Sequence, residues 1–170
     1  MFTLFNTISY NSRGSNVHKL KYINKLLSES SKDSKVLLCA IQEHFLLRPS
    51  LYKIQQGLDD WSVLVKPAYK CPQRLDNGRP AGGLALIFPK FLKKHITQVK
   101  CENWRIQSVI VNINEIKHLF INCYFPVDTK QMGIPKQELL SCLGDISFII
   151  DKNNFNKLVI LGDLNYDDKK

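Results

Sequence analysis

Short apolar runs bounded by polar turns recur through the first half of the chain and predict strands. They lie at residues 2–10, 36–41, 61–65 and 83–88. The first run alternates between apolar and polar side chains, whereas the second is continuously apolar, which is typical of a strand buried on both faces. Between these two runs, Leu20, Ile23 and Leu27 recur at helical spacing, so we expect an amphipathic helix over residues 17–30.

The second half of the chain predicts a hairpin, a helix and a final strand. Residues 106–113 and 118–124 alternate on either side of a polar turn at 114–117, and residues 135–150 have helical periodicity. Four aliphatic residues from Leu158 onward then predict a strand buried on both faces. Because strand–helix units are mixed with hairpins, we expect a single domain built as a mixed α/β sandwich rather than a doubly wound sheet.

The turn after that final run carries two polar side chains suited to chemistry. Gly162 lets the backbone bend, and Asp163 and Asn165 then emerge at the expected carboxyl end of the strand. On extended chain, residues two apart point the same way, so a carboxylate acceptor and an amide donor would face one small volume. Such a volume suits a water molecule beside a phosphate. The alternative interpretation is an ordinary polar turn after a core strand.

The charge of the chain favours a polyanionic partner. Its 24 Lys and Arg residues against 15 Asp and Glu residues give a formal net charge of +9. This balance indicates nucleic acid first and an anionic membrane second, through phosphate neutralisation and counterion release. One basic segment is a candidate nucleic-acid contact, although a charge run is more often a solvated face. Its members are Lys90, Lys93, Lys94 and Lys100.

The five cysteines are widely spaced, odd in number and never form a C-x-x-C pair. We therefore expect reduced core cysteines, with neither a zinc site nor a disulfide scaffold. No apolar stretch approaches the roughly 20 residues of a membrane helix, and no signal-peptide pattern follows Met1. The sequence thus predicts a soluble intracellular protein, nuclear or cytoplasmic and not secreted.

Polar residues also follow other predicted strands, at Asn11, Glu43 and Tyr124. With Asp163 and Asn165, they place four strand ends on one expected rim. In these runs the chain resembles the endonuclease/exonuclease/phosphatase superfamily, which includes exonuclease III-type abasic endonucleases, DNase I and the endonuclease domains of non-LTR (LINE-type) retrotransposons. The matching runs are Ile8-Ser9-Tyr10-Asn11-Ser12-Arg13-Gly14, Ala40-Ile41-Gln42-Glu43-His44, Gly82-Gly83-Leu84-Ala85-Leu86, Ile121-Asn122-Cys123-Tyr124-Phe125-Pro126 and Leu161-Gly162-Asp163-Leu164-Asn165. The first two look most like the retrotransposon endonucleases.

The resemblance implies a DNase I-like, four-layered α/β sandwich and a metal-dependent phosphodiester hydrolase, a DNA-nicking endonuclease of retrotransposon type. Glu43 matches the family's metal-binding glutamate, and Asn11 an asparagine at the metal end of the catalytic site, with Mg²⁺ or Mn²⁺ as the cofactor. Asp163 matches the aspartate that orients or activates the attacking water. Asn165 matches the amide that binds the scissile phosphate and that water, and Tyr124 the tyrosine whose hydroxyl approaches the phosphate. DNA is the implied partner, without a membrane, and an attached reverse transcriptase region in a longer parent protein is a further candidate.

The chain departs from the family pattern after Asn165. Family members continue through further strands to a second aspartate and a Ser-Asp-His motif, whereas all four histidines here precede Asp163. We therefore expect residues 1–170 to be the amino-terminal part of such a domain, with its carboxyl-terminal strands missing. Exposed sheet edges and weak or absent turnover follow, because general acid/base groups contribute about 10²- to 10⁴-fold. His44, which has no catalytic counterpart in the family, is expected to pack beside the site.

Two alternative functions stay open. The chain could be a non-catalytic, nucleic-acid-binding remnant of this family, or a phosphoesterase of the same superfamily that acts on a phosphoinositide or sphingolipid. The basic charge argues mildly against the lipid substrates. Surface loops decide substrate choice in such folds, and the candidates are residues 66–82 and the start of the helix after Pro135. No residue pattern indicates which DNA sequence would be read.

Overall fold

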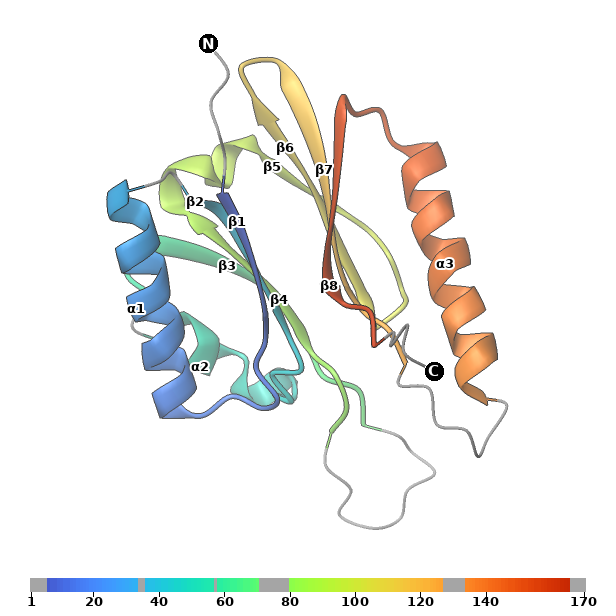
Figure 1. Ribbon diagram of the computed structural model, residues 1–170, viewed down its shortest axis with the longest axis horizontal. Helices are drawn as coiled ribbons and strands as arrows, with labels where there is room; N and C mark the ends of the chain where they lie inside the picture. The colour runs from blue at the N-terminus through green and yellow to red at the C-terminus, as the bar shows by residue number, and fades with distance from the viewer. Residues whose placement is uncertain (1–5, 34–35, 57, 71–79, 127–133, 166–170) are drawn as a thin grey trace.

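Two β-sheets pack face to face with helices on their outer faces, so the fold has four layers (Figure 1). The computed structural model describes residues 6–33, 36–56, 58–70, 80–126 and 134–165. The helices α1 (Val17–Asp33) and α2 (Tyr52–Gln55) cover the first sheet, and α3 (Ile134–Lys152) covers the second. This arrangement confirms the predicted mixed, four-layered α/β sandwich.

The first sheet contains four strands in the order β1-β2-β4-β3. They are β1 (Asn6–Asn11), β2 (Val36–Gln42), β3 (Trp61–Lys66) and β4 (Leu84–Pro89). The pair β1 and β2 is parallel and is connected through α1, whereas β4 runs antiparallel to β2 and to β3. Asn16 caps α1, because its Oδ1 accepts the backbone N–H of Lys19 at 2.9 Å. The polar run before the helix is therefore a capping turn.

The second sheet also contains four strands, in the order β5-β6-β7-β8. They are β5 (Ile96–Val99), β6 (Ile106–Ile113), β7 (Ile116–Tyr124) and β8 (Lys157–Asp163). The hairpin of β6 and β7 is confirmed, but its turn is only Asn114 and Glu115, both with positive φ, which is the tightest form of hairpin connection. The parallel partner of β7 is β8, reached through α3.

Three apolar clusters hold the four layers together. Ile23 and Leu27 of α1 pack on the outer face of the first sheet, against residues such as Ile41 and Ile87. A second cluster, which includes Leu86 and Phe120, fills the space between the sheets. The third cluster joins the second sheet to α3. Its buried members are Ile106, Leu119, Ile121, Cys123, Cys142, Ile146 and Ile149. Each layer is thus buried against its neighbour in the pattern that the apolar spacing predicted.

One predicted burial is wrong. The aliphatic run before Gly162 was expected to be buried on both faces, but β8 is an edge strand of its sheet. Val159 and Leu161 pack toward the core between the sheets, while Leu158 and Ile160 are 40% and 45% exposed. Side chains alternate along a strand, so the exposed pair lies on the opposite face from the packed pair. A continuous aliphatic run predicts a strand but does not show that both of its faces are covered.

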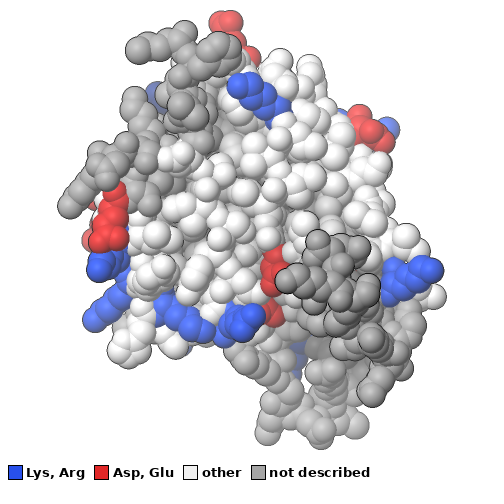
Figure 2. All heavy atoms as spheres, in the orientation of Figure 1, with Lys and Arg blue, Asp and Glu red and all other residues white. Residues whose placement is uncertain are grey.

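The β1 and β8 edges lie side by side on the flank that faces the viewer in Figure 1. In the same orientation, most Lys and Arg atoms lie near the margin and the broad middle is largely uncharged (Figure 2). The opposite flank is formed by the other two edge strands, β3 and β5.

The remaining differences between prediction and structure are small. The helix predicted at 17–30 extends to Asp33, and the one predicted at 135–150 spans Ile134–Lys152. The short strand β5, the helix α2 and the 3₁₀ turns η1 (Arg48–Ser50) and η2 (Lys90–His95) were not predicted, because each is too short for a periodic pattern. The predicted strand at 2–10 is confirmed from Asn6 onward, and its first residues lie outside the described part of the chain.

The prediction of reduced core cysteines is confirmed for three of the four cysteines among the described residues. Cys39, Cys123 and Cys142 are buried free thiols in the core, and Cys101 is partly exposed; Cys71 lies outside the described residues. Burial raises the pKa of the Cys39 thiol to about 12, so this group is inert. Among the helices of the described residues, none is both long enough and apolar enough to span a bilayer.

Candidate active site

The carboxyl ends of β1 and β8 meet across the two sheets and bring Asn11 to Asp163. The Nδ2 of Asn11 donates a hydrogen bond to Oδ2 of Asp163 at 2.5 Å, over 152 residues of sequence. The other carboxylate oxygen of Asp163 accepts the backbone N–H of Asn165 at 3.0 Å. The Oδ1 of Asn11 accepts the backbone N–H of Arg13 at 2.9 Å, so Asn11 both closes its own turn and orients the aspartate.

Glu43 and Tyr124 form a second contact between the sheets. Glu43 directly follows β2, and Tyr124 is the last residue of β7. Burial raises the pKa of the Tyr124 hydroxyl above its usual range, and a hydrogen bond to the Glu43 carboxylate together with the negative charge of Glu43 raises it further. The Arg105 charge opposes this shift. The phenol therefore stays protonated at physiological pH and remains a hydrogen-bond donor.

Backbone strain concentrates at this end of the sandwich, which we call the rim and define as residues 11–14, 43–45, 82–83, 124 and 162–165. Four of the six described non-glycine residues with positive φ belong to it; these are Arg13 (45°), Glu43 (56°), Phe45 (57°) and Asn165 (49°). The other two form the β6–β7 hairpin turn. Such conformations cost about 1–3 kcal/mol each and persist where the surroundings fix them, commonly at functional sites.

Three glycines let the rim close without collision. A Cβ on Gly162 would overlap the carbonyl oxygen of Cys123, and one on Gly82 would overlap the ring of Trp104. The space that a Cβ on Gly83 would need is occupied by the imidazole of His44. All three glycines have positive φ, which L side chains rarely adopt. Steric overlap therefore explains why glycine occupies positions 82, 83 and 162.

His44 packs into the interior beside the candidate site, as predicted. Its side chain is fully buried; Nδ1 accepts the backbone N–H of Leu46 at 2.9 Å and Nε2 lies 3.0 Å from the carbonyl oxygen of Lys66. Burial lowers the pKa of His44, against weaker opposing hydrogen bonds. With both nitrogens engaged, the neutral ring has no free atom for catalysis, so its role is to support the backbone after Glu43.

A buried polar pair behind the rim connects the sheets. The Nε2 of Gln42 donates to Oδ1 of Asn122 at 2.8 Å, and Nδ2 of Asn122 donates to the carbonyl oxygens of Ile41 and Ala85. Gln42 precedes Glu43 directly, and Asn122 lies two residues before Tyr124 on the same strand face. The pair thus fixes the two strand ends that carry the site. Both residues belong to runs that match the family, but the sequence analysis predicted no role for them. A polar residue inside an otherwise apolar strand was the feature that could have indicated a buried polar contact.

Lys66 was predicted to belong to a basic substrate-selecting loop, and this is wrong. It ends β3, and its Nζ donates to the carbonyl oxygens of Cys101, Asn103 and Ile106 at 2.6, 2.6 and 2.8 Å. These bonds tie the edge of the first sheet to the second and leave no free ammonium group. The middle of the predicted loop, residues 71–79, lies outside the described residues.

An aromatic and cationic stack borders the site and was not predicted. The rings of Tyr69 and Trp104 are stacked with centroids 5.4 Å apart. The guanidinium of Arg105 lies 4.0 Å from the Trp104 ring centroid and 5.3 Å from that of Tyr124, and its Nη2 is 2.7 Å from Glu138 of α3. Because Arg105 is held on both sides, it fixes the Tyr124 ring in place.

The predicted geometry of Asp163 and Asn165 needs one correction. The chain is not extended here, since Asn165 has a φ of 49° and turns back onto the aspartate. Its Nδ2 donates to the carbonyl oxygen of Phe125 at 2.6 Å. Each Asn amide nitrogen carries two N–H groups, so one donor remains for another partner.

The oxygen donors at the rim suit Mg²⁺, which prefers carboxylate and amide oxygens and retains several waters. No group of three or more His, Cys, Asp or Glu side chains is gathered for a metal ion among the described residues. The carboxylates among the described rim residues are Glu43 and Asp163, and both oxygens of Asp163 accept hydrogen bonds, from Asn11 and from the backbone N–H of Asn165. The donor set fits a hydrated hard cation and not a closed structural site.

Comparison with solved structures identifies the architecture. The AP endonuclease LMAP from Leishmania major has 15% sequence identity with this chain and superposes with a TM-score of 0.63 over 94% of this chain and 54% of its own. The APE2 catalytic domain of Xenopus laevis has 16% identity and a TM-score of 0.62, covering 94% and 58%. The fold is DNase I-like.

A third neighbour has the same fold and carries DNA. The 3′ phosphatase NExo from Neisseria, bound to a product DNA hairpin, has 15% identity and a TM-score of 0.62, covering 94% of this chain and 57% of its own. The chain therefore spans 54–58% of the length of these three structures. No family model matches the chain, and no curated protein sequence matches it.

Proposed function

We propose that this protein is a Mg²⁺-dependent phosphodiester hydrolase that nicks DNA. The observation that carries the proposal is the strained rim, where Asn11 contacts Asp163 and Glu43 contacts Tyr124 across the two sheets of a DNase I-like fold. The net charge of +9 supports a polyanionic substrate. The names of solved neighbours, an AP endonuclease and a phosphatase with its DNA product, support DNA as that substrate.

In this proposal Asp163 accepts the proton of the attacking water. Its carboxylate is oriented from two sides, by the side chain of Asn11 and by the backbone N–H of Asn165. A carboxylate held in this way loses little freedom when the reactants assemble, and proton transfer to a positioned group contributes about 10²- to 10⁴-fold. Asn11 is in this sense a positioning residue for Asp163.

Tyr124 and Asn165 bind the scissile phosphate. The Tyr124 hydroxyl keeps its proton because burial and Glu43 raise its pKa, and a phosphate oxygen would replace Glu43 as its acceptor. The free N–H of the Asn165 amide supplies a second donor. Donors fixed before the reaction stabilise the charge that develops on the phosphate oxygens.

Glu43, with Asn11 beside it, would hold the metal ion. When bound, Mg²⁺ neutralises phosphate charge and polarises the phosphoryl group. Glu43 is fixed for this purpose by the hydrogen-bonded strand β2 before it and by buried His44 after it. Its left-handed backbone conformation turns the residue out of the sheet at the point where β2 ends.

Plasmid nicking tests the proposal. Supercoiled DNA incubated for hours with an excess of protein should be converted slowly to the open circular form in Mg²⁺, as expected for weak turnover, and should remain supercoiled in EDTA. Glu43→Ala and Asp163→Ala should each abolish the nicking, while circular dichroism shows that both variants fold. Nicking that persists in both variants would contradict the proposal, because the activity would then come from another site or another protein.

We also propose that the activity is of the retrotransposon endonuclease type, which would make an attached reverse transcriptase region a partner. Support comes from the run Tyr10-Asn11-Ser12-Arg13-Gly14 and from Gln42-Glu43-His44. Plasmids with and without abasic sites separate the subclasses, since this type should nick intact DNA. Cleavage restricted to abasic plasmid, or release of phosphate from phosphoinositide or sphingolipid instead of DNA nicking, would overturn the assignment.

A further inference from the structure

At the end of the sandwich opposite the rim, a cavity of about 420 Å³ opens between the edge strands β3 and β5. It is lined by the first residues of β3, by Phe88 at the end of β4 and by Ile96 at the start of β5. The same two edges are closed at the rim end, where Lys66 binds three carbonyl oxygens and Gln107 donates to the carbonyl of Leu64 at 3.0 Å. The sheets are thus tied at one end and separated at the other.

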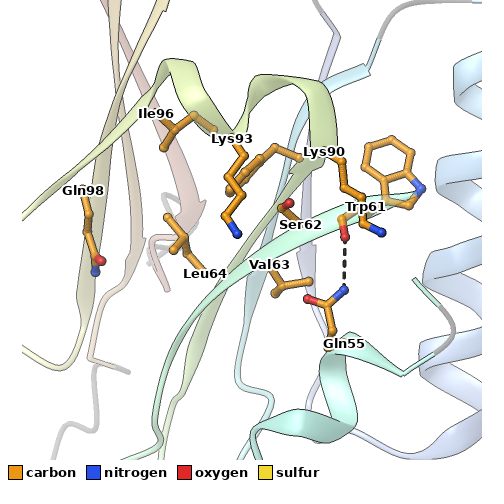
Figure 3. Close-up of a pocket in the computed structure, with 10 residues that line it drawn as sticks. Gln55, Trp61, Ser62, Val63, Leu64, Lys90, Lys93, Ile96 and Gln98 are labelled. Atoms are coloured by element: carbon orange, nitrogen blue, oxygen red, sulfur yellow. Dashed lines mark hydrogen bonds between the residues drawn. The ribbon is translucent and has the colours of Figure 1, made fainter. Parts of the chain in front are cut away.

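The cavity is cationic. Lys90 and Lys93 of η2 line it, and Ser62 and Gln98 add polar groups, whereas its lining contains no Asp or Glu. Figure 3 shows the Lys93 side chain reaching down from η2 toward Leu64 and Val63 of β3, and the Lys90 side chain lying beside Trp61. In the described part of the chain, neither lysine forms an ion pair. Two ammonium groups that line one cavity without an ion-pair partner among the described residues favour an anionic group as its occupant.

The 3₁₀ geometry of η2 explains why charge and an aromatic ring lie side by side. With 3.0 residues per turn, residues three apart share one side of the turn. Lys90 and Lys93 therefore lie over the cavity, Phe91 and Lys94 share the next side, and Leu92 is buried in the core. The Phe91 side chain is 72% exposed and, with the three lysines, borders a second hollow of about 480 Å³.

We propose that η2 is a second nucleic-acid contact, separate from the rim, that binds single-stranded DNA. Phosphates bind to Lys90 and Lys93, an unpaired base stacks on Phe91, and Lys94 lies beside the next phosphate. Cationic grooves that border an exposed aromatic ring are the usual way in which single strands are bound without sequence preference. A single exposed ring gives little burial in a lipid surface, so the pattern favours nucleic acid over membrane.

The length of β3 sets the reach of this contact. Five residue steps separate Trp61 at the cavity from Lys66 at the rim end of β3, which corresponds to about 17 Å at roughly 3.3 Å per step. A strand in a duplex rises about 3.4 Å per nucleotide and an extended single strand rises more, so at most about five nucleotides cover that distance. Lys100 directly follows β5 and precedes Cys101, whose carbonyl oxygen accepts a hydrogen bond from Lys66. Binding at η2 would hold a strand whose continuation reaches the rim.

Fluorescence anisotropy with a labelled dodecanucleotide tests this contact, in EDTA so that no cleavage occurs. The double variant Lys90→Gln/Lys93→Gln should weaken binding about tenfold and reduce the salt slope by about 1.4, roughly 0.7 for each lost phosphate contact. Phe91→Ala should weaken binding at least about fivefold, and Phe91→Tyr should restore it, because stacking needs only the ring. A matched double variant, Lys21→Gln/Lys117→Gln, removes the same charge from other exposed positions and should change affinity less than twofold.

The outcomes separate this inference from the proposed activity. Glu43→Ala should bind the oligonucleotide as the unaltered protein does, so loss of nicking leaves the η2 contact standing. Equal weakening in the control and the η2 double variant would overturn the inference, as would unchanged affinity of Phe91→Ala. Vesicles with about one third phosphatidylserine provide the last arm, and η2-dependent binding to vesicles without binding to the oligonucleotide would identify a membrane contact instead.

Discussion

The polar groups at the two ends of the sandwich differ in whether other residues hold them in place. At the rim, Asn11, Asp163 and Tyr124 are each held by a hydrogen bond from or to the facing sheet. At η2, Lys90 and Lys93 form no ion pair with any described residue and are exposed. The difference follows from position, since the rim residues end strands of two packed sheets and η2 is a surface turn. Fixed groups suit chemistry, whereas accessible charges suit binding.

The largest expected effect separates rate from affinity at the two ends. Asp163→Asn removes the proton acceptor and should lower the single-turnover nicking rate at saturating DNA by about 10²- to 10⁴-fold, with DNA affinity changed less than twofold. Lys90→Gln/Lys93→Gln should do the reverse and raise the DNA concentration at half-maximal rate about tenfold. Nicking rates measured over a range of DNA concentrations give both quantities. If both variants altered the same quantity, the two ends would not differ in function.

Steric closure of the rim should dominate stability. Gly162→Ala forces a Cβ onto the Cys123 carbonyl oxygen at a φ of +148°, so we expect a loss of about 2–4 kcal/mol in the free energy of unfolding. Gly144 of α3 is the matched control, because a Cβ there meets nothing within 4 Å. Gly144→Ala should gain about 0.5–1 kcal/mol from helix propensity. Urea denaturation measures both, and a similar change in the two variants would remove the steric argument.

A matched pair of lysines tests the tie between the sheets. Lys66→Met leaves three carbonyl oxygens without their ammonium donor and should cost about 2–3 kcal/mol of unfolding free energy. Lys94→Met removes an exposed lysine of η2 and should change stability by less than about 0.5 kcal/mol. The difference in unfolding free energy is measured from the urea midpoints of the two variants, provided that the dependence of the free energy on urea concentration is the same in both. Equal effects would show that the rim end is not held more tightly than η2.

A smaller, pH-dependent effect distinguishes two histidines. Burial lowers the pKa of His44 in the folded state, while the unfolded chain has a value of about 6.5. Below that pH the unfolded state binds the proton more readily, so stability is complete above about pH 6.5 and falls as the pH drops, by at most about 1.4 kcal/mol per unit. Unfolding free energies between pH 5 and 7.5 should show this slope in the unaltered protein and in His95→Asn, a change on η2. The slope should disappear in His44→Asn, and its persistence there would exclude His44 as the cause.

The elements of the fold could be predicted from the sequence because most strands and both long helices carry their own periodic pattern. The contacts between these elements could not be predicted. The bond between Gln42 and Asn122 joins residues 80 apart, and nothing local to either strand indicates the partner. The same holds for Lys66, whose basic character predicted a solvated loop but whose ammonium group binds the opposite sheet. The prediction that both faces of β8 are buried failed for a related reason. Whether a strand face is covered depends on which other elements pack against it.

The candidate site was predicted in a different way. Asn11, Glu43, Tyr124 and Asp163 each ended a predicted strand, and the structure brings them together in pairs. What the sequence could not show is the left-handed backbone at Glu43 and Asn165, which turns each residue away from the direction that an extended chain would give. Their chemical roles stay predictions until activity is measured.

Binding of Mn²⁺, followed by paramagnetic broadening of backbone amide signals in NMR spectra, tests the central claim most directly because it does not require turnover. The broadening should be centred on Glu43 and Asn11, should disappear in Glu43→Gln, and should be unchanged in Lys90→Gln/Lys93→Gln. Broadening that persists in Glu43→Gln, or that is centred away from the rim, would contradict the claim that these strand ends form a metal-dependent phosphoesterase site.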